Sequence, residues 1–555
     1  MKPKHLCAAV AMSCVVFLAL TPSMRAQEAS APKHTGVPQD WSQGQIVFTR
    51  QGLAEHPEVM NREARVLQQA RQRWAVPDFG VFNDGNPVSI APRKKGIHRD
   101  WNMSMGGRMT PNTFPIKYSI DPGLPPDCAN DFAVFGLAVP GNPNNPVAPA
   151  NLVAFNNLYV NGTGTGFCTG TLPTVLFAYN ITTVTGGRIR TSPIISLDGT
   201  KLAFVESIPA NIGLGIPAQA IFHILTWTPG GTIAAPVVPT MTSILFSPAA
   251  NDFTSSPWID YDADTVYVGA DSGLVYQITG VFHGVPTLSG APWPATLFAG
   301  HLTPPVLDST RGLLMVGGVD GKLYQVNTTT GSVASVVVGS GFGSGIVAPP
   351  IVDVTNQTTF VVSSDNGSSG AVLSEFDTSS LAPLATGSLG KGSFGGGTVI
   401  NLYQPAFDHN YYNDPSTGFI HGCGTGAGDT TPWQYSFAFT GRNMHTLPAS
   451  SAQLLTSTAA RCTGWTEFYN PNAGVAGSDF FFFGLTQDCL GVGTAFGCLE
   501  ALSSDITIPT AFAQLTSGPR GIVVDNFSSQ AQASSLYTTS GAVNTAYKFT
   551  QNGLN

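Results

Sequence analysis

Charged residues are scarce in this chain. Asp, Glu, Lys and Arg make up 10% of its 555 residues, against roughly a quarter in ordinary soluble proteins. The formal net charge is −8, and no basic stripe with interleaved aromatic residues appears, which argues against a nucleic-acid partner. Beyond the N-terminus no apolar run approaches the roughly 20 residues that a membrane-spanning helix needs. We therefore expect no nucleic-acid partner and no membrane span.

Catalytic motifs are also missing. The sequence contains no Gly-x-Ser-x-Gly elbow, no phosphate-binding loop and no His-Glu-x-x-His pattern. Its later histidines are scattered, with none at metal-ligand spacing: His283, His301, His409, His421 and His445. We therefore predict no catalytic residue and no metal site, and we expect no cofactor.

The chain does contain a repeated motif, which consists of a proline, two apolar residues and an aspartate. Clear copies begin at Pro257, Pro305, Pro350 and Pro405, and a looser copy begins at Pro193. The first intervals are 48 residues (305 − 257) and 45 residues (350 − 305). This is the length of one four-stranded propeller blade. Since Gly and Pro are abundant, at 62 and 41 residues, many tight turns between short strands are expected as well.

Weaker copies extend the repeat to both sides. The predicted fold is an all-β propeller of about eight four-stranded blades, with seven as the alternative because the text near 403–462 is irregular. The last blade shows only three strands, and 113–120 is predicted to supply the fourth, since its apolar residues alternate. The weaker strands are expected at 131–139, 152–160 and 174–180, taken as the first three of their blade, and at 479–485, 496–502, 521–525, 535–540 and 545–550.

The N-terminus has the pattern of an export signal. Lys2 and Lys4 precede an apolar stretch over 6–20, and Ala26 ends a small-residue cleavage site. Residues 1–26 are therefore predicted to be a signal peptide, and the mature protein is expected to be secreted or periplasmic.

A segment of different character separates the signal from the repeats. Residues 27–112 are predicted to form an N-terminal extension with one helix near 57–74, followed by the propeller over 113–555. Trp41 and Trp101 in this extension are expected to pack against the propeller rather than to anchor a partner.

The cysteine content fits an exported protein. Without Cys7 and Cys14 in the signal, six of the eight cysteines remain, an even number as expected for an oxidised chain. The pairing that fits the blades best is Cys489 with Cys498, and the other two pairs would then be Cys423 with Cys462 and Cys128 with Cys168. A zinc site is the competing interpretation, although no two of the six have zinc-knuckle spacing. Sequence alone leaves the connectivity open.

One aspartate per repeat stands directly after the predicted first strand. Such a position is typical of a residue that caps a turn, because catalytic groups rarely recur once in every repeat. Asp260 also begins a run that resembles a calcium loop, but Thr265 stands where that loop needs glycine. The repeated aspartates are Asp198, Asp260, Asp308, Asp353, Asp408 and Asp525.

The copy from Pro305 to Asn327 resembles the repeat of the PQQ-like (quinoprotein) β-propeller superfamily, and the likeness covers about 190–375. The superfamily includes quinone-dependent dehydrogenases and non-catalytic relatives that bind or scaffold proteins. Its enzymes hold the quinone with adjacent cysteines, a stacking tryptophan and a calcium-bound carboxylate cluster. This chain has no adjacent cysteines, and its Trp258, Trp293 and Trp433 do not match the stacking position. It is also similar to secreted bacterial propeller proteins of unassigned function.

Two functions from different classes follow. The first is a secreted, non-catalytic propeller that binds or scaffolds a protein or a cell-surface polysaccharide, and the missing catalytic groups favour it. The alternative is a degenerate quinone- or metal-dependent oxidoreductase, which the resemblance alone implies.

Overall fold

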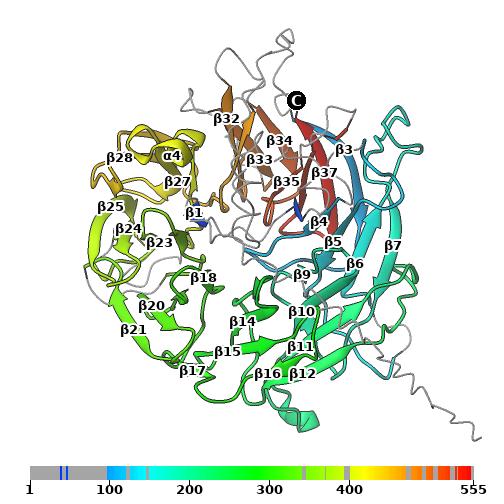
Figure 1. Cartoon of the computed structure of the whole chain (residues 1–555). Helices are drawn as coiled ribbons and strands as arrows, with labels where there is room; N and C mark the ends of the chain where they lie inside the picture. The colour runs from blue at the N-terminus through cyan, green and yellow to red at the C-terminus, as the bar shows by residue number, and fades with distance from the viewer. Residues whose placement is uncertain are drawn as a thin grey trace, which may run out of the picture.

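Eight four-stranded antiparallel blades form a ring around a central channel (Figure 1). The predicted propeller of eight blades is thus confirmed, and seven blades is wrong. The computed structural model describes 97–119, 125–145, 149–340, 345–368, 370–392, 400–470, 477–489, 495–503, 511–525, 532–533 and 535–551, together with the backbone of short strands at 38–39 and 46–47.

From the channel outward, the strands of blades 1 to 7 follow sequence order (Figure 1), whereas the outermost strand of blade 8 comes from earlier in the chain. Blade 1 consists of β4 (Ile116–Tyr118), β5 (Phe132–Gly136), β6 (Leu152–Asn156) and β7 (Thr174–Tyr179), and blade 2 consists of β8 (Arg188–Ile189) with β9 (Ile194–Ile195), β10 (Lys201–Ile208), β11 (Gln219–Thr226) and β12 (Thr242–Ser247). Blade 3 consists of β13 (Trp258–Asp260), β14 (Thr265–Gly269), β15 (Leu274–Thr279) and β16 (Thr287–Leu288) with β17 (Ala295–Thr296). Blade 4 consists of β18 (Val306–Asp308), β19 (Leu313–Gly317), β20 (Lys322–Asn327) and β21 (Val333–Val337).

The second half of the ring continues in the same way. Blade 5 consists of β22 (Ile351–Asp353), β23 (Thr358–Ser363), β24 (Gly370–Asp377) and β25 (Pro383–Lys391), and blade 6 consists of β26 (Ala406–Phe407), β27 (Phe419–Thr425), β28 (Pro432–Thr440) and β29 (Asn443–Met444) with β30 (Ser450–Gln453). Blade 7 consists of β31 (Thr466–Asn470), β32 (Ser478–Leu485), β33 (Gly497–Ser503) and β34 (Ala511–Leu515). Blade 8 consists of β35 (Val523–Asp525), β36 (Ser535–Thr539), β37 (Thr545–Gln551) and β3 (Ile97–Ser104). The short strands β1 (Pro38–Gln39) and β2 (Ile46–Val47) pair with β22 and β4.

The repeated prolines mark equivalent places in the ring. Each directly precedes the innermost strand of its blade, at β9, β13, β18, β22 and β26. Proline has no backbone N–H, so it fits the position at the start of a strand. The residues in question are Pro193, Pro257, Pro305, Pro350 and Pro405.

Five of the six repeated aspartates cap the turn after the innermost strand, as predicted, and the turn after the sixth, Asp525, lies outside the described residues. In blade 4 the Asp308 carboxylate accepts hydrogen bonds from the backbone N–H groups of Thr310 and Arg311 at 3.0 and 3.2 Å. In blade 5 Asp353 does the same for Thr355 and Asn356, both at 2.9 Å. Equivalent bonds are made by Asp198, Asp260 and Asp408.

The ring closes differently from the prediction. The outer strand of the last blade is β3, which pairs antiparallel with β37, so the proposal that 113–120 closes the ring is wrong. That segment contains β4, the innermost strand of blade 1. The strands at 131–139, 152–160 and 174–180 are accordingly the second, third and fourth of their blade, not the first three. Alternation of apolar residues marks a half-buried strand but does not say which place in a blade it takes.

The N-terminal extension is described only in part. The helix predicted near 57–74 and Trp41 lie outside the described residues. Trp101 lies in β3 and packs as expected: it is buried against Phe155 and Tyr537 with ring centroids 6.3 Å away in each case. Its indole N–H donates to the carbonyl of Leu158 at 2.9 Å. Trp101 therefore ties the last blade to the first.

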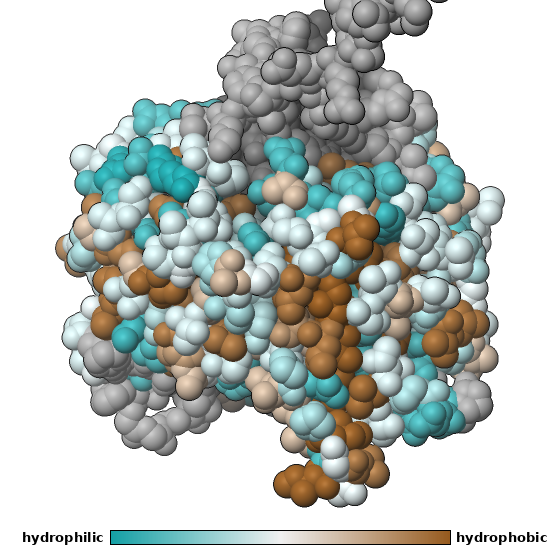
Figure 2. All heavy atoms as spheres, turned by 60° about the horizontal axis from the view of Figure 1, so that its bottom comes forward, coloured by the Kyte–Doolittle hydropathy of each residue, from teal (hydrophilic) through white to brown (hydrophobic). Residues whose placement is uncertain are grey.

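Helices are few among the described residues. They are α4 (His409–Asn413) and the 3-10 turns η1 (Ile212–Leu214) and η2 (Pro415–Thr417). None has the length and apolar character to cross a membrane. The turn η1 projects from the rim of blade 2, with Ile212 at 96% and Leu214 at 61% exposure, and Figure 2 shows apolar surface that includes a projecting tip.

One face of the ring carries the connectors that lead from one blade to the next and the turns between second and third strands. We call it the connector face. Neighbouring connectors are hydrogen-bonded to one another around the channel, which holds this face in place. Examples are Phe114 N–H to Ser192 Oγ at 3.0 Å, Ser192 N–H to Ser256 Oγ at 2.9 Å, Trp465 N–H to the Gln404 carbonyl at 3.0 Å and Gly521 N–H to the Thr113 carbonyl at 3.0 Å.

Candidate functional site

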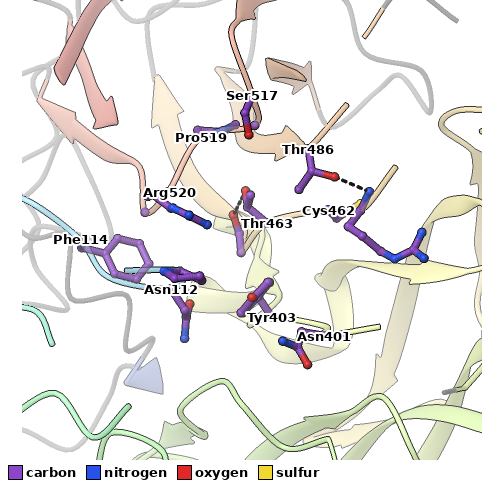
Figure 3. Close-up of a pocket in the computed structure, with 15 residues that line it drawn as sticks. Asn112, Phe114, Asn401, Tyr403, Cys462, Thr463, Thr486, Ser517, Pro519 and Arg520 are labelled. Carbon is purple, nitrogen blue, oxygen red and sulfur yellow. Dashed lines mark hydrogen bonds between the residues drawn. The ribbon is translucent and has the colours of Figure 1, made fainter. Parts of the chain in front are cut away.

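A pocket of about 190 Å³ opens on the connector face where blades 6, 7, 8 and 1 meet (Figure 3). Its walls are the connectors before β26, β31, β35 and β4. The lining residues are Pro111, Asn112, Phe114, Asn401, Tyr403, Arg461, Cys462, Thr463, Gly464, Thr486, Ser517, Gly518, Pro519, Arg520 and Gly521.

The connector of blade 7 is held at several points. The hydroxyl of Thr486 accepts a hydrogen bond from the Arg461 backbone N–H at 2.9 Å, drawn in Figure 3. The Thr463 hydroxyl accepts from the Gly484 N–H at 2.8 Å. Cys462 is joined to Cys423 by a disulfide with Cα atoms 6.2 Å apart. This wall of the pocket is therefore preorganised by the blade behind it.

Two arginines give the pocket its charge. Arg461 donates through Nη1 to the Ala460 carbonyl at 2.7 Å, and Arg520 donates through Nη2 to the Gly541 carbonyl at 2.9 Å. Burial lowers the pKa of both guanidinium groups, and the nearby Arg108 lowers that of Arg520 further. Both stay cationic at neutral pH, since arginine is effectively always protonated.

Several polar groups in and beside the pocket have no partner in the described part of the chain. The Nε–H of Arg520 is buried and makes no hydrogen bond, and neither amide atom of the buried Gln404 is paired. Gln404 lies against the pocket-lining Gly464, where an added Cβ would come within 2.9 Å of its amide. Unpaired buried donors cost about 1–3 kcal/mol each, so the site favours a ligand that supplies acceptors.

The remaining side chains of the pocket make hydrogen bonds and carry no reactive group. Asn112, which precedes blade 1, donates to the carbonyl of Val347, which precedes blade 5, at 3.3 Å. Burial raises the pKa of Tyr403, which keeps its hydroxyl protonated. The lining contains no histidine, aspartate or glutamate, and its one cysteine is in a disulfide. The lining residues thus include no nucleophile with an adjacent base.

The six cysteines predicted to form disulfides lie in the expected pairs. Besides Cys423 and Cys462, the structure joins Cys128 to Cys168 and Cys489 to Cys498, with Cα atoms 5.8 and 5.4 Å apart. Among the described residues, the one group of three potential metal ligands that lie close together is Cys489, Cys498 and Glu500. Its two sulfurs are bonded to each other, so neither is a free thiolate ligand.

The other residues considered in the sequence lie apart from the pocket. Trp258 and Trp293 are buried in the core between blades 3 and 4. Two of the histidines have local partners: Nδ1 of His301 lies 2.7 Å from Asp271, and Nδ1 of His421 lies 2.8 Å from the Ser436 hydroxyl. They are not gathered into one site in the described structure.

Sequence reasoning missed the arginines of the connector face. A signal existed, because Arg190, Arg461 and Arg520 each stand three to five residues before an innermost strand. In a chain this poor in charge, a cation at the same place in three repeats marks a shared face.

Comparisons with known proteins identify no family for this chain. No known protein family matches the chain, and no curated protein does. Among solved structures, a chain from one described as "Crystal Structure of Mitotic Checkpoint Complex" aligns with 10% identity and a TM-score of 0.37, over 63% of this chain and 86% of that chain. Likeness at this level carries no functional argument, and the resemblance to the PQQ-like superfamily stays a prediction.

Proposed function

We propose that this protein is a secreted, non-catalytic binding module that holds a protein partner on its connector face. The observation that carries the proposal is the pocket between blades 6 to 8 and blade 1, which is rich in hydrogen-bond donors and lacks a nucleophile with its base. The three disulfides support export, because such bonds persist in oxidising compartments.

The shape of the site favours a protein over a polysaccharide. Protein interfaces are dominated by a few anchor side chains that fill well-packed pockets, and a cavity of about 190 Å³ fits one such anchor. A polymer would need a run of neighbouring subsites. No observation on the described residues favours the quinone- or metal-dependent oxidoreductase.

Site-specific photo-cross-linking tests the proposal. A photoreactive amino acid would replace Asn401, which lines the pocket, or Thr329, an exposed residue in a turn on the opposite face. Both variants would be expressed in a host that exports them and irradiated with its extracellular proteins. We expect a discrete cross-linked protein from position 401 and not from 329. Equal labelling from both positions, or none from either, would contradict binding through the connector face.

A further inference from the structure

We infer that the pocket receives the carboxylate of an aspartate or glutamate side chain presented by the protein partner. This inference rests on the proposed function and names the chemistry that the site recognises.

The first argument is uncompensated charge. The pocket is lined by two arginines and no acidic residue, and in the described chain no carboxylate lies within ion-pair distance of either one. Partial burial of a guanidinium without an anion is unfavourable, as the lowered pKa values of Arg461 and Arg520 reflect. An incoming carboxylate would supply the missing charge.

The second argument is the fixed direction of one free donor. Arg520 is anchored by its backbone N–H to the Thr539 carbonyl and by Nη2 to the Gly541 carbonyl, both at 2.9 Å. Its buried Nε–H is left unpaired, and Figure 3 shows the side chain directed between Phe114 and Thr463 toward the middle of the pocket. A guanidinium edge held in this way suits an oxyanion and loses little entropy on binding it.

The third argument concerns the size and charge of the anion. Arg461 uses Nη1 on the carbonyls of Thr458 and Ala460, and of the two pocket arginines it is Arg520 that has a buried donor without a partner among the described residues. A single negative charge matches the guanidinium edge of Arg520 better than a phosphate dianion does. A cavity of about 190 Å³ corresponds to roughly six water volumes, enough for a short acidic side chain.

The setting makes such recognition selective. The protein carries a net charge of −8, so an acidic partner is repelled by the molecule as a whole and attracted at this pocket. Like-charge repulsion elsewhere and attraction at one site together favour a particular docking position.

Selection from a random 12-residue peptide library displayed on phage tests the inference on the full secreted protein. Three targets would be used: the wild type, Arg520→Leu, and Lys391→Met, which removes the same charge from an exposed residue outside the pocket. We expect one position enriched in Asp or Glu with the wild type and with Lys391→Met, and loss of that enrichment with Arg520→Leu. Thermal melting of each variant establishes that it is folded, and Arg520→Lys, which keeps the charge without the planar fork, should bind with intermediate affinity.

The selected peptide then distinguishes the outcomes by fluorescence anisotropy. Replacing its acidic residue by the matching amide should weaken binding about 10- to 100-fold, the range for a charge-assisted hydrogen bond, and higher salt should weaken it too. Peptides that bind through the pocket without an acidic preference, or that bind better with phosphoserine at that position, would overturn the carboxylate inference and leave the binding module intact. Failure to select any peptide, or preference for an oligogalacturonate over every peptide, would overturn the protein partner itself.

Discussion

The ammonium group of Lys117 in blade 1 lies 2.7 Å from the carboxylate of Asp525 in blade 8. Both side chains are fully or almost fully buried. The same ammonium lies 3.7 Å from Asp131, whose carboxylate accepts a hydrogen bond from the Tyr159 hydroxyl at 2.6 Å. Asp525 is one of the repeated aspartates, so in the last blade this position joins the two ends of the ring by an ion pair.

Replacing Lys117 by methionine should destabilise the ring strongly. The substitution keeps the side-chain length but leaves Asp525 and Asp131 buried without their cation, and breaking a buried ion pair in this way costs about 3–5 kcal/mol. Chemical denaturation followed by tryptophan fluorescence measures the change. The double variant Lys117→Met with Asp525→Leu should recover part of the loss, because it removes one uncompensated charge. A single variant as stable as the wild type would show that the pair does not hold the ring closed.

The repeat could be predicted from the sequence because one short motif specifies one structural position. Proline, two apolar residues and aspartate place an edge strand and its turn cap, as at Pro305 and Asp308, and nothing distant is needed to interpret them. The number of blades follows from the spacing of such phrases.

The closing strand could not be predicted, because the residues with which it pairs lie far away in the sequence. Residues 97–104 include Arg99 and Asp100, which look like loop residues. Asp100 is buried because it pairs with Lys548 and accepts a hydrogen bond from the Thr550 hydroxyl at 2.6 Å, more than 400 positions later. The pocket was missed for the same reason, since it is built by four separate connectors that have no sequence motif in common.

Shortening Trp101 to alanine should open the closure between the last and first blades. Its ring packs on Phe155 and Tyr537, and its N–H donates to the Leu158 carbonyl, so the loss should be about 3–5 kcal/mol. Trp101→Phe, which keeps much of the packing, should lose less. Thermal melting and light scattering are the measurements, because an uncovered β37 edge would also promote aggregation. Equal melting temperatures for alanine and wild type would argue against this role of β3.

Stability should fall as pH rises from about 5 to 9. Burial raises the pKa of Glu500 from 4.5 to about 8 and that of Glu375 from 4.5 to about 7. Between the unfolded and folded pKa values the folded state holds a proton that the unfolded state has lost. Stabilisation is therefore complete below about 4.5 and lost as pH rises through the folded pKa, at up to about 1.4 kcal/mol per pH unit for each group.

Glu500→Gln separates this effect from other titrations. The amide is neutral at every pH, so the variant should match the wild type near pH 4 and exceed its stability above pH 8. Unfolding free energies from denaturant titrations across the pH range check it. Parallel curves for the two proteins would show that Glu500 is not the buried acid responsible.

Removing the Cys423–Cys462 disulfide should affect both stability and the pocket. The bond joins positions 39 residues apart, and the loop-entropy relation gives about 4 kcal/mol for a loop of that length. Since Cys462 lies between Arg461 and Thr463 in the pocket wall, the double variant with serine at both cysteines should also weaken the binding of a ligand selected on the wild type. The matched control is the double variant Cys128→Ser with Cys168→Ser, which removes a disulfide that closes a similar loop of 40 residues in blade 1. This variant should lose comparable stability but keep its affinity for the ligand. An equal loss of affinity in both variants would mean that the disulfide supports the fold alone and does not position the pocket.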